Sequence, residues 1–188
     1  MRSAHNVKLK FVRQAHNVLS MMDRTTNLLG VVGLAVADRI EDVARDILGR
    51  VGETPAALVV IGHGTDLSND GLSRILGLSH TGTVRLVNRL VTDGLVERHE
   101  GQDRRAVALQ LTNRGYGVRD ELLHGRLSAM DSILASLSSS ERETLDLLLS
   151  KILTSMDTTA SERRTLCRLC NVEICSNCPI PASDGSVT

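Results

Sequence analysis

The sequence contains almost no aromatic residues: its 188 residues include one Phe, one Tyr and no Trp. A platform for single-stranded nucleic acid needs aromatic side chains on which bases stack, so this class of site is disfavoured. The core must instead be aliphatic, because hydrophobic residues still make up 41% of the chain. This composition is typical of helices packed through Leu, Val and Ile, and the length suffices for one domain with a substantial core.

The chain also lacks an excess of charge of either sign. Its 22 Lys and Arg balance its 22 Asp and Glu, so the formal net charge is zero. A DNA-binding protein usually gains affinity by neutralising phosphates. If this chain binds DNA, its arginines must therefore act through their placement and through duplication in a dimer, and we expect modest non-specific affinity.

No hydrophobic run approaches the roughly 20 residues that a membrane-spanning helix needs. The apolar run at residues 28–37 is far shorter. The N-terminus also lacks the succession of basic flank, apolar run and small-residue cleavage site that marks a signal peptide. These absences predict a cytoplasmic protein.

Residues 66–111 contain the most informative pattern in the chain. Leu72, Ile75 and Leu76 give a first short helix an apolar side, and Gly77-Leu78-Ser79 forms a tight turn after it. The Ser79 hydroxyl can accept a hydrogen bond from a backbone N–H group in the first turn of a second helix, which makes it a good N-cap. Two short helices joined in this way predict a helix-turn-helix.

A β-hairpin pattern follows the second helix. Val107, Leu109 and Leu111 alternate with Ala or polar residues, which is typical of a half-buried strand. Residues 95–98 form the expected partner strand, and residues 100–103 the tip. A helix-turn-helix followed by a hairpin with an arginine-bearing tip is a winged helix-turn-helix, which reads double-stranded DNA. The predicted fold class is therefore mainly α with a small β-hairpin wing.

The second helix has a polar side that suits the major groove. At about 100° per residue, Val84, Val87, Leu90 and Val91 face the core. The opposite side carries Thr81, Arg85, Asn88, Arg89 and Thr92. Arg can donate a bidentate pair to guanine, Asn to adenine, and a Thr methyl group can contact thymine. Gly82 leaves room for the backbone to approach a phosphate; the alternative for the whole helix is an ordinary solvated face.

The stretch LSHTGTVRLVNRL, followed by DGLVER and DRRAVALQLT, resembles the MarR family of bacterial transcription regulators. The resemblance covers residues 25–156 and is most specific at residues 67–115. It implies a homodimer whose two winged helices read a near-palindromic operator, often released by a small ligand or an oxidant. It also implies that Asp103-Arg104-Arg105 is the D-x-R triplet of the wing, with Arg105 in the minor groove and Asp103 bracing an arginine. A narrow, A·T-rich minor groove favours arginine because it concentrates negative potential.

The rest of the chain predicts the domain organisation. Long helical patterns flank the winged helix, and Ser138 with Glu141 fits a capping box between the last two. These helices carry more aliphatic surface than one small domain can cover, which predicts a dimer with recognition helices ~34 Å apart. The predicted parts are an N-terminal amphipathic extension (1–24), a MarR-like domain (25–156, with dimerisation helices at 25–50 and 112–156 and a DNA-binding lobe at 54–111), and a Cys-rich tail (157–188).

Residues 62–65 form a glycine-rich stretch, which raises the question of a phosphate-binding loop. Thr54-Pro55 begins a short helix, and Gly62-His63-Gly64-Thr65 follows it. A phosphate-binding loop needs a preceding strand and a Lys followed by Ser or Thr, and neither is found here. We predict a turn, with His63 at the surface or in packing.

The cysteines all lie within twelve residues, as two C-x-x-C pairs: Cys167, Cys170, Cys175 and Cys178. Two thiolates of one pair can reach one metal from a single turn, and two pairs complete a tetrahedral S₄ shell, which suits zinc. Cys178 precedes a proline, as the last cysteine of ferredoxin-type runs does, so an iron–sulfur cluster is the competing prediction. A dithiol redox switch, disulfides and unligated thiols on a disordered tail are the other interpretations, although a reducing cytosol disfavours disulfides.

The main functional prediction is a dimeric, sequence-specific transcriptional regulator, expected to be a repressor, that responds to a small ligand, a metal or a redox signal. The sequence has no cofactor fingerprint, nucleophile elbow or catalytic His, Asp and Glu cluster, so we do not expect an enzyme. The alternatives are a thiol or iron–sulfur redox protein whose winged helix binds a protein partner, and a winged-helix interaction module that does not bind DNA.

Overall fold

The computed structural model describes residues 3–64, 67–101, 107–174 and 177–181, with side chains from residue 24 onward. The chain divides into two compact units, Met1–Ile40 and Glu41–Thr188. Helix α1 (Ser3–Leu48) is continuous across the predicted boundary between residues 24 and 25, so the separate N-terminal extension stays a prediction. Among the described helices, none has both the length and the hydrophobicity to cross a membrane.

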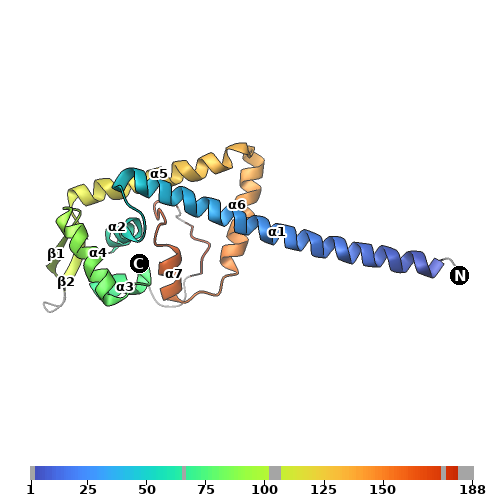
Figure 1. Cartoon of the computed structure of the whole chain (residues 1–188), viewed down its shortest axis with the longest axis horizontal. Coiled ribbons are helices and arrows are strands. Elements are labelled where there is room, and N and C mark those ends of the chain that lie inside the picture. Colours follow the sequence, from blue (N-terminus) through green and yellow to red (C-terminus); the bar gives the residue numbers. More distant parts are fainter. Residues whose placement is uncertain (1–2, 65–66, 102–106, 175–176, 182–188) are drawn as a thin grey trace. The chain divides into compact units, whose positions relative to one another are not determined.

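The second unit contains the end of α1 and the remaining elements, and its fold is mainly α with an antiparallel hairpin, as the sequence predicts. In β1 and β2 the paired residues run from Val96 with Leu111 to Glu100 with Val107. The elements are α2 (Thr54–His63), α3 (Asn69–Leu76), α4 (His80–Thr92), β1 (Val96–Glu100), β2 (Val107–Leu111), α5 (Asn113–Ile133), the 3₁₀ turn η1 (Leu134–Ser136), α6 (Ser139–Thr154) and α7 (Ala160–Leu166) (Figure 1).

The turn between α3 and α4 forms as the sequence predicts. Gly77 has φ of 66°, a left-handed conformation that glycine adopts without steric cost. Its backbone N–H donates to the Ser73 carbonyl and ends α3. Two residues later the Ser79 hydroxyl accepts from the Gly82 N–H at 3.1 Å and starts α4. Local sequence therefore fixes both ends of the turn.

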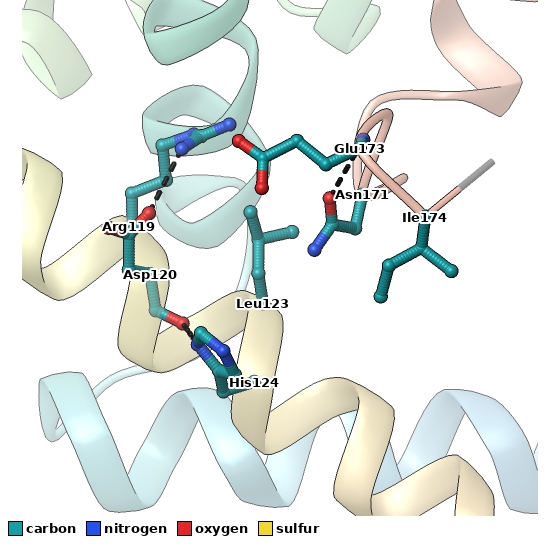
Figure 2. Close-up of a pocket in the computed structure, with 7 residues that line it drawn as sticks. All are labelled: Arg119, Asp120, Leu123, His124, Asn171, Glu173 and Ile174. Atoms are coloured by element: carbon teal, nitrogen blue, oxygen red, sulfur yellow. Dashed lines mark hydrogen bonds and ion pairs between the residues drawn. The ribbon is translucent and has the colours of Figure 1, made fainter. Parts of the chain in front are cut away.

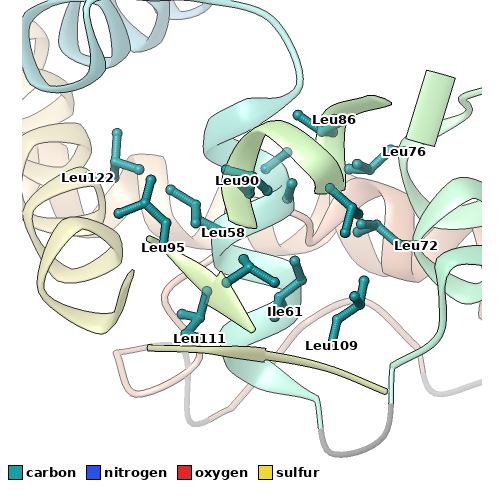
Figure 3. Close-up of a cluster of buried hydrophobic side chains, with 14 of the residues drawn as sticks. Leu58, Ile61, Leu72, Leu76, Leu86, Leu90, Leu95, Leu109, Leu111 and Leu122 are labelled. Carbon is teal, nitrogen blue, oxygen red and sulfur yellow. The ribbon is translucent and has the colours of Figure 1, made fainter. Parts of the chain in front are cut away.

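The core lies among α2, α3, α4 and the hairpin, and it is aliphatic as expected (Figure 3). Five of its leucine and isoleucine side chains are at most 1% exposed: Leu58, Ile61, Leu72, Leu90 and Leu109. Burying each such side chain contributes roughly 1.5–3 kcal/mol. This core holds α4 with one side inward and the other in solvent.

The inward side of α4 differs from the predicted one by a small rotation. Leu86 and Thr83 are buried, whereas Val84 and Val91 are only partly buried. Thr83 is tolerated in the core because its hydroxyl donates to the Ser79 carbonyl at 3.1 Å, which satisfies the polar atom. The core therefore includes a polar residue of α4 that an apolar pattern cannot indicate.

Two smaller expectations are also corrected. Val107 is 49% exposed, because it pairs with Glu100 in the last pair of the ladder. Helix α2 begins at Thr54, with Glu53 at the cap position, and it continues to His63 instead of ending near Ile61. The predicted break therefore falls at Gly64, two residues later.

Candidate nucleic-acid interface

Helix α4 presents its predicted polar side to solvent. Arg85, Asn88 and Arg89 are exposed, as are Thr81 and Thr92. On the opposite side Val87 and Leu90 are fully buried. A helix held in this way, with arginine and asparagine pointing outward, has the arrangement that reads base edges in the major groove.

Asn88 has a partner that sequence reasoning missed. Arg98, on β1, donates from Nη2 to Asn88 Oδ1 at 2.6 Å. The contact orients the amide so that its nitrogen remains available to donate, and it places another positive charge beside α4. No helical or strand period relates residues ten apart on different elements, so only the fold reveals this pair.

The C-terminal end of α4 is tied to two other elements through Asp93. Arg50, just after α1, lies 2.8 Å from the Asp93 carboxylate. Arg114, on α5, donates to the Asp93 carbonyl at 3.1 Å. Both arginines thereby help to position the helix, which the sequence did not indicate.

The start of α4 gives a structural reason for its glycine. A Cβ atom at Gly82 would lie 3.2 Å from Ser79 Oγ, tighter than an ordinary contact. Gly82 thus lets the Ser79 cap close over the first turn. Close approach of this backbone to a phosphate stays a prediction. Nearby, His80 Nδ1 lies 3.0 Å from Asp70 Oδ1 and joins the first turns of α3 and α4 at the surface.

The predicted wing triplet lies outside the described residues. Asp103, Arg104 and Arg105 belong to residues 102–106, between the strands that end at Glu100 and begin at Val107. The hairpin that would carry the wing is therefore present, and the roles of these three residues stay predictions.

The cysteine tail is described in part. Cys167 is the C-cap residue of α7, and the Cys170 N–H donates to its carbonyl at 2.8 Å, so the first pair sits on one tight turn. Cys167, Cys170 and Cys178 are half-buried, and Cys175 lies outside the described residues. Among the residues that the structure describes, no three His, Cys, Asp or Glu side chains gather in a metal-binding arrangement. Metal binding by the four cysteines stays a prediction.

A pocket of about 300 Å³ lies between α5 and the tail (Figure 2). Arg119, which is 8% exposed, lies on its α5 side, and the Glu173 carboxylate of the tail points toward it. Arg119 also forms an ion pair with Asp120 at 3.0 Å. The tail is therefore packed on the winged-helix unit, a relation that the sequence did not predict.

Comparison with known proteins gives a family match over the same region. Residues 52–106 match the model described as "MarR family". The chain is 33% identical over 87 residues to the transcriptional repressor MprA of Escherichia coli. That match covers 46% of this chain and 49% of the repressor, so the chain spans about half the length of this curated relative.

Solved structures share the fold. A MarR family protein from Bacillus stearothermophilus superposes with a TM-score of 0.65 and 22% identity, over 74% of this chain and 97% of that one. A MarR family protein from Mycobacterium tuberculosis in complex with DNA gives a TM-score of 0.56 and 18% identity, over 68% and 95%. At these identities the likeness establishes the fold alone.

Proposed function

We propose that this chain, whose residues 52–106 match the MarR family model, is a dimeric, sequence-specific transcriptional regulator that acts as a repressor. The supporting observation is the exposed face of α4, where Arg85, Asn88 and Arg89 project from a helix whose other side is buried. Regulators of this family bind DNA and are not enzymes. The proposal includes a cytoplasmic location, a near-palindromic operator and release by a small ligand, a metal or a redox signal.

Exposed apolar side chains support the dimer. On α6, Leu147 is 70% exposed and Leu148 54%, and none of the residues of this fully described helix is buried. Within the first unit, Leu34 of α1 is 68% exposed. Large apolar side chains exposed next to each other, as Leu147 and Leu148 are, mark an interface in soluble proteins. A second copy would cover it and, through two-fold symmetry, would present two recognition helices to one duplex.

Selection from a random duplex library tests this function. The full-length protein is expected to enrich an inverted repeat whose half-sites are about 10 bp apart, centre to centre. Gel shifts with the selected duplex should give one complex with two protein chains. Enrichment of no motif, or of a single half-site bound by one chain, would contradict the proposal. A coloured protein that enriches no motif would favour the redox alternative.

We also propose that Cys167, Cys170, Cys175 and Cys178 together bind one metal centre, either a zinc ion or an iron–sulfur cluster. The supporting observation is the turn that closes between the first two cysteines, where the Cys170 N–H bonds the Cys167 carbonyl. Such a turn brings both thiolates to one side of the chain, as a shared metal requires.

Anaerobically purified protein is expected to contain one zinc ion per chain, or iron and sulfide with visible absorption. Cys178→Ser should lose this metal, because three thiolates hold a tetrahedral centre far less tightly than four. Elemental analysis and an absorption spectrum provide the measurement. Protein without metal whose four thiols are joined in disulfides would contradict the proposal.

A further inference from the structure

The tail segment, defined here as residues 160–174, caps the first helix of the helix-turn-helix. The last four carbonyls of an α-helix have no partner within the helix. In α3 one of these is the Ile75 carbonyl, and Thr165 Oγ1 of α7 donates to it at 3.1 Å. Ile75 stands two residues before Gly77, whose left-handed turn leads into α4. The contact therefore lies beside the turn between the two helices of the helix-turn-helix.

A second contact holds the tail segment to α2 and α5. His63 Nε2 lies 3.1 Å from the Cys170 carbonyl, and His63 Nδ1 lies 3.2 Å from Arg119 Nη2. The geometry is that of a neutral imidazole that donates to Cys170 and accepts from Arg119. Burial lowers the pKa of His63, and the Cys170 hydrogen bond only partly opposes that shift.

Arg119 is itself fixed by close packing. It is 8% exposed, and a Cβ atom at Gly62 would lie 2.4 Å from its Cδ atom. Glycine at this position is what allows the arginine to reach His63. The contacts that run from α5 through His63 to Cys170 thus begin at a closely packed side chain, Arg119.

Between the two contacts lies the first cysteine pair. Leu169, inside the C-x-x-C turn, packs against the hydrophobic core. Arg168 Nη1 donates to the Thr165 carbonyl at 2.7 Å, which joins the turn to the residue that caps α3. A change in the shape of the cysteine turn must therefore displace Leu169, Thr165 or both.

We propose that the tail segment is an intramolecular regulatory element. It is docked through Thr165 and His63, and it fixes α3 in the arrangement that binds the operator. Through these contacts the helix-turn-helix senses the chemical state of the cysteines. This inference rests on the DNA-binding function proposed above. It differs from a mechanism that acts through the dimer helices, because the contacts reach α3 directly.

The first test replaces Thr165 with Val in the full-length protein, which keeps the shape of the side chain and removes its hydroxyl. Operator affinity is expected to fall roughly 5-fold or more. Thr165→Ser is the matched control, because it keeps the hydroxyl that donates to the Ile75 and Ser161 carbonyls. Unchanged affinity in Thr165→Val, or an equal loss in the control, would overturn the proposal.

Hydrogen exchange distinguishes failure of the inference from failure of the proposed function. The Gly77 and Leu78 amide N–H groups bond to the Ser73 carbonyl, and their exchange should be faster in Thr165→Val than in the control. This readout needs no DNA. Faster exchange in a protein that binds no operator would support the contact and refute the function, whereas unchanged exchange would overturn the contact itself.

A second arm tests whether the cysteines act through these contacts. All four cysteines lie in the tail, so iodoacetamide, added after reduction and chelation, modifies cysteine only there. The treatment should weaken operator binding by the wild-type protein roughly 5-fold or more, and should have little further effect on the double variant His63→Ala, Thr165→Val. An equal loss of affinity in both proteins would overturn this coupling.

Discussion

Replacing Arg89 with alanine is expected to weaken operator binding by about 1–3 kcal/mol at each half-site, or roughly 5- to 150-fold. Arg89 is exposed on the polar side of α4, where no core contact depends on it. A bidentate contact to guanine would be lost together with its discrimination against other bases. Fluorescence anisotropy with the selected operator and with single-base variants measures both the loss and the relaxed specificity.

The control for Arg89→Ala is a cation of equal charge elsewhere on the second unit. Lys151 is exposed near the end of α6. Lys151→Ala should retain the sequence specificity, with any change in affinity equal for all duplexes, because it removes charge without removing a base contact. An Arg89→Ala variant that loses the same affinity for every duplex, with its specificity retained, would show that Arg89 contacts the phosphate backbone and does not read bases.

Gly115→Ala is expected to destabilise the fold by about 1–3 kcal/mol or more. A Cβ atom at Gly115 would lie 2.0 Å from the Leu95 carbonyl oxygen and 3.3 Å from Leu111 Cβ. The carbonyl cannot turn away without cost, because it accepts the Thr112 N–H at 3.1 Å. Urea denaturation should show a lower midpoint for this variant than for the wild-type protein.

Helix α5 supplies the matched control two residues further on. Among the described residues, nothing lies within 4 Å of a Cβ atom placed at Gly117. Gly117→Ala should therefore be neutral or stabilising by up to about 1 kcal/mol, since alanine is the better helix former. A similar midpoint for both alanine variants would mean that the backbone at Gly115 yields easily and that the clash is unimportant.

The elements that local sequence determines were predicted well. Ser79 and Gly77 act within a few residues of their own positions, so capping rules are enough to predict the helix-turn-helix from the sequence. The polar side of α4 followed from helical spacing alone. Its inward side was less well predicted. The Thr83 hydroxyl donates to the backbone carbonyl of Ser79, so this polar residue can be buried, whereas an apolar pattern predicts only residues such as valine and leucine in the core.

Contacts between residues distant in the sequence could not be predicted. His63 and Cys170 are 107 positions apart, and neither lies in a pattern that names the other. The sequence predicts Gly62 only as part of a turn and makes no prediction for Gly115, whereas the structure shows that each admits a close neighbour. The sequence gives one clue for the tail: it follows the last long helix directly, so it starts next to the folded unit. Its docking site on α3 had no such clue.

The exposed apolar surface of α6 makes the stability of the proposed dimer depend on the concentration of the protein. In the proposed dimer, Leu147 and Leu148 leave water only when a second copy arrives, so each tenfold dilution takes about 1.4 kcal/mol from the assembled state. A cell that makes fewer copies of the protein would then also have copies that are each less stable. Transcription of the target would therefore respond more steeply than linearly to gene dosage.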